Sequence, residues 1–206
     1  MKEFGSLQTA SQEAQQAGQN TAEVMTLQEI LDAYGSELEG NPSIYCGTYG
    51  KYNGGSIFGA WLDLTKFSDY EEFIDVCRQL HSDESDPELM FQDYECFPRE
   101  LYSESCMDED TFDKIQQYAA LSESDREAFD DYLESGHDFD IDIFREVYQG
   151  KWNSEEDFAE DILFSCYDVE KEMGGLYRFF DMEAFARELF MYDYYMGSHN
   201  HVFRVY

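Results

Sequence analysis

The chain has 206 residues and carries 46 Asp and Glu against 13 Lys and Arg, a formal net charge of −33. Its aromatic content of 17% is too high for an acidic disordered chain and indicates a folded, mostly helical protein. Negative charge repels nucleic acid and anionic membranes, so we expect no direct binding to either; basic proteins, polyamines or divalent metals are the favoured partners.

Targeting and redox signals indicate a reducing compartment. The five cysteines include no C-x-x-C pair, and no apolar run follows the first six residues or approaches the length of a membrane span. We therefore expect no signal peptide, reduced thiols and a location in the bacterial cytoplasm. We expect no cofactor and no catalytic residue, because no phosphate-binding loop, zinc-protease motif or nucleophile elbow is present.

The first predicted unit, residues 1–42, is a leader followed by one short helix. Residues 1–24 are rich in Gln, Ser, Ala and Gly, and we expect them to be flexible. Leu27, Ile30 and Tyr34 recur at helical spacing, which predicts a helix within residues 25–39 that packs on the next domain.

The second unit, residues 43–102, is predicted to be an N-terminal α+β domain. Residues 44–49 and 57–64 are strand candidates, joined by a Gly-rich hairpin turn over residues 50–55. A helix capped by Ser68 or Asp69 follows, and residues 89–94 predict a third strand. The apolar stripe of the helix is Tyr70, Phe73, Ile74, Cys77 and Leu80.

The third unit, residues 103–150, is predicted to be a domain of short helices. Fifteen acids and only three basic residues lie in this segment, and many of the acids fall between apolar stripes. Gly136 and Gly150 end the second and third helices. The three stripes are Phe112, Ile115, Tyr118 and Ala119; Ala128, Phe129, Tyr132 and Leu133; and Ile141, Phe144, Val147 and Tyr148.

The last unit, residues 151–206, is predicted to be a second α+β domain. A long helix is expected over residues 154–173 and another over residues 181–191. A hairpin of residues 192–196 and 201–206 closes the chain. The inward stripe of the long helix is Phe158, Ile162, Cys166, Val169 and Met173. Together these elements predict the α+β class with short antiparallel sheets.

Two patterns in the sequence resemble metal-binding sites, and each has a simpler interpretation. Asp138, Asp140 and Asp142 alternate as in an EF-hand loop, but Ile143 and Gln149 stand where that loop requires Gly and Glu, so we expect an acidic helix start. His199 and His201 share a strand face without an identifiable third ligand, so we expect surface turn residues. The Gly-rich stretch of residues 50–55 lies between strands and within negative charge, unlike a phosphate-binding loop.

The acidity itself calls for an explanation. Like charges four residues apart on a helix, such as Glu156 with Glu160 or Glu127 with Asp131, each cost a few tenths of a kcal/mol. A sequence that keeps many such destabilising pairs indicates that function or high salt requires the charge. Because duplex DNA carries about one charge per 1.7 Å, 33 charges match roughly 56 Å of duplex, or about 17 base pairs.

Several stretches resemble the ArdA antirestriction proteins. Residues 44–56, IYCGTYGKYNGGS, followed by GAWL at 59–62, resemble the opening of that family, and QDYE at 92–95 resembles the end of its first domain. DMEAFAREL at 181–189, and SHNHVF with the terminal VY, resemble its C-terminus. The resemblance covers residues 43–206 and leaves the leader unmatched.

The resemblance implies an elongated homodimer of three small domains, α/β, helical and α/β, with the dimer contact in the last. Such proteins imitate bent B-form DNA, occupy the DNA-binding groove of type I restriction–modification enzymes and protect mobile DNA. Carboxylates on the helices would then stand where phosphates stand. The residues expected in these positions are Asp69, Glu71, Glu72, Asp75, Asp108, Glu109, Asp110, Asp113, Asp125, Asp130, Asp131, Glu134, Glu155, Glu156, Glu160 and Asp161.

Two other functions stay open at this point. One is an acidic inhibitor or binding protein for a different basic DNA-binding protein, such as a nucleoid protein or another defence nuclease. The other is a hydrolase with a carboxylate pair, which would require two inward acids in a cleft with little charge around them.

Overall fold

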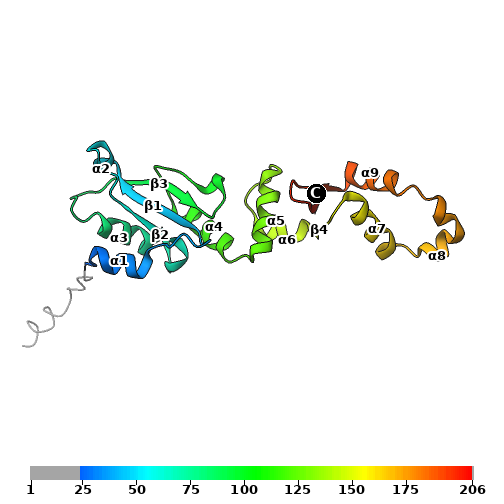
Figure 1. Ribbon diagram of the computed structural model, residues 1–206, viewed down its shortest axis with the longest axis horizontal. Coiled ribbons are helices and arrows are strands. Elements are labelled where there is room, and N and C mark those ends of the chain that lie inside the picture. Colours follow the sequence, from blue (N-terminus) through cyan, green and yellow to red (C-terminus); the bar gives the residue numbers. More distant parts are fainter. Residues whose placement is uncertain (1–23, 206) are drawn as a thin grey trace, which may run out of the picture.

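The computed structural model describes residues 24–205, and residues 1–23 and Tyr206 lie outside it. The leader predicted to be flexible therefore falls outside the described residues, apart from Val24. The molecule is elongated, with one sheet and its helices at one end, short helices in the middle and a helical arm at the other end (Figure 1). Helices and two short antiparallel sheets confirm the predicted α+β class.

The first sheet has three antiparallel strands in the order β2-β1-β3, formed by Ala60–Asp63, Ser43–Thr48 and Leu89–Glu95. The central strand β1 buries Ile44 and Cys46 completely. Helices α1 (Leu27–Tyr34) and α3 (Tyr70–Leu80) contact each other and complete this end of the molecule. The prediction that the first helix packs on the following domain is confirmed, because Ile30 is fully buried.

The predicted tight hairpin turn is wrong. Residues Tyr49–Asn53 form a short helix, α2, because the Thr48 side chain accepts a hydrogen bond from Lys51 N and caps the turn. Gly55, at φ +83, leads the chain out of it. Strand β2 consequently begins at Ala60 rather than residue 57, and Leu64 already belongs to a 3-10 turn, η1 (Leu64–Lys66). A second such turn, η2 (Arg99–Leu101), follows β3.

The middle of the molecule consists of α4 (Glu109–Ala119), α5 (Glu123–Glu134) and α6 (Ile141–Val147), as the stripes predict. Their buried residues join one core that runs from the first sheet to the second. Phe73 stacks on Phe112, Phe129 meets Phe144, and Phe144 meets Phe203. Packing thus crosses both predicted boundaries, near residues 102 and 150, and those boundaries stay predictions.

The second sheet has the order β4-β6-β5, formed by Tyr148–Lys151, His201–Arg204 and Tyr194–Met196. The closing hairpin is therefore confirmed, with strands at Tyr194–Met196 and His201–Arg204 in place of residues 192–196 and 201–206. Tyr192 belongs to the preceding helix, and Tyr206 lies outside the described part. Strand β4 begins directly after α6, so residue 150 lies inside a strand of this sheet. Helix α9 (Met182–Tyr192) agrees with the expected helix over 181–191.

The long helix expected over residues 154–173 is two helices, α7 (Glu155–Cys166) and α8 (Val169–Glu172). Tyr167 has an extended backbone, and the Asp168 side chain caps the new helix by accepting a bond from Lys171 N. The break also changes the inward face: α7 buries Phe158, Ala159 and Leu163, whereas Cys166 is exposed. A 3-10 segment, η3 (Gly174–Phe179), joins α8 to α9. No helix within residues 24–205 is long and apolar enough to cross a bilayer.

Candidate interaction surface

Acidic side chains project from the exposed faces of several helices along the molecule. Asp69 and Asp108 cap α3 and α4 by accepting bonds from Glu72 N and Thr111 N, so the acids that follow lie in the first turns. Such positions are favourable because the helix N-terminus is positive. The predicted acids that are exposed are Asp69, Glu71, Asp75, Asp108, Glu109, Asp110, Asp113, Glu134, Glu155, Glu156, Glu160 and Asp161. We call these twelve residues the acidic face set.

Three further predicted acids are only partly exposed because each serves a local contact. Glu72 accepts bonds from the Tyr34 hydroxyl and from Ser68, and these bonds lower its pKa, led by that from the Ser68 backbone. Asp125 accepts a bond from Ser122, the cap of α5. Asp130 accepts the Tyr118 hydroxyl on both carboxylate oxygens, at 3.1 and 3.0 Å.

The prediction that Asp131 lies on the acidic surface is wrong, because its side chain is fully buried. It faces the turn between β5 and β6, where it accepts bonds from Ser198 Oγ at 2.8 Å and from His199 N at 3.1 Å. A Cβ at Gly197 would collide with this carboxylate. Burial alone would raise the pKa of Asp131, but the bonds from Ser198 and His199 outweigh it and lower the pKa. Asp131 therefore holds α5 to the second sheet.

We expect Asp131→Ala to lower the free energy of unfolding by about 2–3 kcal/mol, because it leaves His199 N without its acceptor and Ser198 Oγ with Glu134 as its one carboxylate acceptor. The measurement is urea unfolding at pH 7, with Asp138→Ala, an exposed acid, as the matched control. Folding lowers the pKa of Asp131, so its carboxylate stabilises the fold at pH values above the ordinary pKa of 3.8. This stabilisation is lost as the pH falls below that value and the carboxylate is protonated. An equal loss in both variants would contradict this role.

The histidine and calcium-loop predictions have different outcomes. His199 is exposed, as expected, but the expectation for His201 is wrong because its side chain is buried. The Tyr148 hydroxyl lies 2.9 Å from His201 Nδ1. Burial lowers the pKa of His201. Asp140 caps α6 by accepting bonds from Asp142 N and Ile143 N, which confirms the acidic helix start. The sequence offered no sign that His201 is buried, because β6 is the central strand of a sheet assembled from distant segments.

Lys51 in α2 occupies the centre of a group that sequence reasoning missed. Its Nζ lies 3.0 Å from His81 Nδ1, 2.7 Å from Asp83 and 3.1 Å from Glu84. These three side chains have the spacing of metal ligands, but the ammonium already supplies the positive charge between them. Thr48 Oγ1 also donates to Glu84 at 2.6 Å. The arrangement ties α2 to the end of α3 and is best explained as structural.

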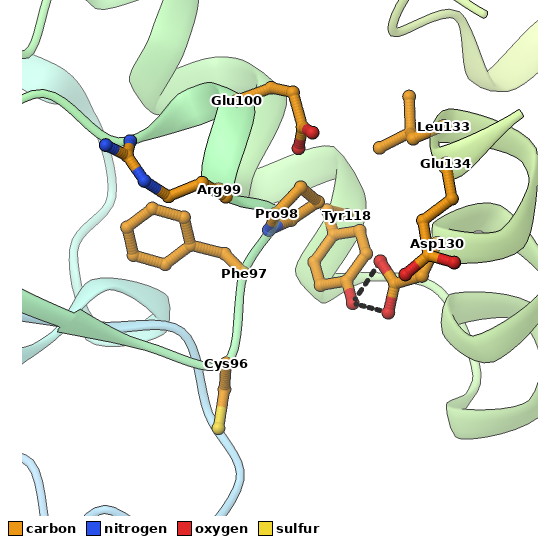
Figure 2. Close-up of a pocket in the computed structure, with 9 residues that line it drawn as sticks. All are labelled: Cys96, Phe97, Pro98, Arg99, Glu100, Tyr118, Asp130, Leu133 and Glu134. Atoms are coloured by element: carbon orange, nitrogen blue, oxygen red, sulfur yellow. Dashed lines mark hydrogen bonds between the residues drawn. The ribbon is translucent and has the colours of Figure 1, made fainter. Parts of the chain in front are cut away.

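A hollow of about 300 Å³ lies where the segment after β3 meets α5. Phe97, Pro98, Tyr118 and Leu133 give it apolar walls, and its acids are Glu100, Asp130 and Glu134. Figure 2 shows the Tyr118 hydroxyl pointing at Asp130, with the Glu134 side chain beside it. Burial raises the pKa of Asp130, and the charges of Glu134 and Glu100 raise it further.

We define the arm as α7, α8, η3 and α9, which lie at the far end of the molecule (Figure 1). Several large apolar side chains of the arm are exposed. Leu176 and Phe179 are each 71% exposed, the largest values in the arm's exposed apolar set. That set consists of Phe164, Tyr167, Leu176, Phe179, Met191 and Tyr192. Several exposed apolar side chains within one part of the molecule indicate a surface for association.

Comparison with known families gives one match. The family described as Antirestriction protein (ArdA) matches residues 44–204. The match begins in β1 and ends in β6, so it contains both sheets, the middle helices and the arm. Helix α1 lies outside it. No curated protein matches the sequence.

Proposed function

Because this chain belongs to the ArdA family of antirestriction proteins, we propose that it inhibits type I restriction–modification enzymes by imitating B-form DNA. Its carboxylates would occupy the positions of phosphates in the DNA-binding groove of the enzyme. The inhibition is competitive and involves no bond-making step. By keeping the groove occupied, the protein protects incoming mobile DNA.

The observation that carries this proposal is the placement of the acidic face set. Helices α3, α4 and α7 each bury an apolar stripe and turn acids to solvent, and they lie at successive points along an elongated molecule (Figure 1). Within residues 24–205, Asp110 is the one member of the set that forms an ion pair, with Lys114 at 2.7 Å. The other eleven acids have no ion-pair partner among the described residues. Unpaired exposed carboxylates are available to Lys and Arg of a basic groove.

We further propose that the protein acts as a homodimer joined through the arm. The exposed apolar set supports this, since it covers a part of the molecule that is otherwise acidic. A dimer would carry charge equivalent to roughly 110 Å of duplex, about 33 base pairs on the spacing of DNA phosphates. The elongated protomer suits such a length, because charge spread along one axis follows a duplex better than charge on a sphere.

Neutralising one helix of the acidic face set should weaken inhibition only modestly. We expect Asp108→Asn, Glu109→Gln, Asp110→Asn and Asp113→Asn together to raise the concentration for half inhibition about three- to tenfold, because exposed ion pairs contribute about 0–1 kcal/mol each. Asn at 108 retains a helix cap. The control exchanges Glu109→Asp, Asp110→Glu and Asp113→Glu and keeps the charge. Complete loss from one exposed acid in a folded variant would contradict the distributed mimic.

Complex formation tests the proposed target directly. The purified full chain and a purified type I methyltransferase core are mixed and separated by size-exclusion chromatography at low salt. We expect one complex that contains both proteins, and we expect DNA cleavage by the complete enzyme to stop at matching stoichiometry. Separate elution of the two proteins, with cleavage unaffected, would exclude this target.

A further inference from the structure

Within the diffuse acidic surface, the hollow beside α5 has the features of a specific site. We propose that it receives the guanidinium of one arginine from the basic partner, held among Glu100, Asp130 and Glu134 with its stem against Leu133 and Pro98. The inference rests on the proposed function for the identity of the partner, but the chemistry of the hollow stands separately.

The first argument is shape. The hollow measures about 300 Å³, at the lower end of the range of about 300–1,000 Å³ for small-ligand sites. Apolar and acidic groups line it from both sides: Phe97 and Pro98 lie next to Glu100 of η2, and Leu133 lies on α5 with Asp130 and Glu134. A side chain with an aliphatic stem and a cationic head can contact both kinds of group at once.

The second argument is uncompensated charge. Within residues 24–205, none of Glu100, Asp130 and Glu134 forms an ion pair with Lys or Arg. Arg99, which borders the hollow, points away from Asp130 in Figure 2 and donates to Tyr102 O at 3.0 Å. The Arg126 guanidinium donates hydrogen bonds to three backbone carbonyls, those of Leu121, Gly40 and Ala119. Arg126 lies near enough to lower the pKa of Asp130, and Ser198 Oγ donates to Glu134 at 3.1 Å, but neither is an ion pair, so a cation from a partner can still pair with the three acids.

The third argument separates a guanidinium from a metal ion. Among the described residues, the acidic and histidine groups whose ligand atoms all lie within 4.8 Å are His81, Asp83 and Glu84, and Asp131, Glu134 and His199. The carboxylates of the hollow are spread more widely than that. A guanidinium has five donors in a planar fork and spans carboxylates that a single ion cannot reach. Asp130 and Glu134, one helical turn apart on α5, present acceptors on one face for such a fork.

A fourth observation concerns stability. Asp130 is half-buried and repelled by Glu100 and Glu134, and its pKa is raised. For a carboxyl group whose pKa is raised by folding, the charged form destabilises the fold above its ordinary pKa. Asn at this position would keep an oxygen for the Tyr118 hydroxyl and remove the repulsion. A raised carboxyl pKa beside two further acids in a hollow agrees with a site that receives a cation.

The test has a binding arm that needs no restriction enzyme. Ethylguanidinium is titrated into the full chain while the methyl signals of Leu133 are followed by NMR, with those of Leu163, buried in α7, as the internal reference. We expect saturable shifts at Leu133 with a Kd in the millimolar range, about tenfold stronger than with ethylammonium and absent with the neutral N-ethylurea. Asp130→Asn should weaken binding at least tenfold, and Asp138→Asn, an exposed acid outside both the hollow and the acidic face set, should not. Equal binding by both variants, or none by the wild type, would overturn the proposal.

The functional arm uses the same two variants against a type I enzyme. We expect Asp130→Asn to raise the concentration for half inhibition about tenfold, Asp138→Asn less than about twofold, and the unfolding temperature of Asp130→Asn to equal or exceed that of the wild type. Equal inhibition by the two variants, or a lower unfolding temperature for Asp130→Asn, would overturn the arginine site. If the wild type does not inhibit at all, the proposed function fails, and the titration still decides the chemistry of the hollow.

Discussion

The double substitution Leu176→Asp and Phe179→Asp is expected to convert the protein from a dimer to a monomer and to weaken inhibition at least tenfold. Both side chains are 71% exposed in η3, so the substitutions remove no buried packing within the protomer. In a dimer they would be desolvated, and a carboxylate buried in an apolar contact costs several kcal/mol. The measurement is the solution mass by sedimentation equilibrium, relative to the protomer mass of 24.1 kDa.

The matched control is Ile57→Asp, because Ile57 is 75% exposed and lies before β2, outside the arm. We expect it to leave the mass and the inhibition unchanged. Two chains of charge −33 repel each other, so the wild-type dimer should tighten as salt screens that repulsion. A double variant that remains dimeric would show that the arm is not the contact.

Salt should act in the opposite direction on the complex with the enzyme. Binding to a basic groove releases counterions and gains screened charge pairs, so affinity falls as salt rises. A protein with 6–10 phosphate contacts loses about 10³–10⁵ in DNA affinity between 50 mM and 200 mM salt. Carboxylates on a protein hold fewer condensed counterions than duplex DNA. We therefore expect the affinity of this protein for the enzyme to fall about a hundredfold over the same range of salt.

Calorimetric titration of the methyltransferase core with the wild-type protein measures this slope. Running it at protein concentrations where the dimer is complete at every salt separates the two opposing effects. The Asp108, Glu109, Asp110 and Asp113 quadruple variant should give a shallower slope than the charge-conserving control. Affinity that is independent of salt would mean that apolar contacts, and not the acidic face set, hold the complex.

The local helices of this molecule are readable from sequence because their signals are local. Helices α3 to α6 each carry an apolar stripe at the helical period, bounded by a capping Asp or Ser, and all four occur where the stripes predict. The closing hairpin is likewise marked by its turn residues. Family resemblance, not periodicity, supplied the elongated arrangement and the expectation of a dimer.

One prediction that failed was decided by a local helix cap, and the others depended on contacts between distant segments. The stripe of Phe158 and Ile162 continues past Cys166, but the Asp168 cap favours a new helix start and breaks it. Asp131 looks like its exposed neighbours on α5, and only the turn that contains Ser198 buries it. The hollow is equally invisible in sequence, because it joins the segment after β3 to α5.

Competition between this protein and duplex DNA tests the central claim most directly. A fluorescent duplex that contains the enzyme's recognition site is bound to a purified type I methyltransferase core, and the wild-type protein is added at several DNA concentrations and salt levels. We predict complete displacement of the duplex, with a half-displacing concentration that rises in proportion to the DNA present. A ternary complex in which the enzyme holds both the protein and the duplex would contradict the account.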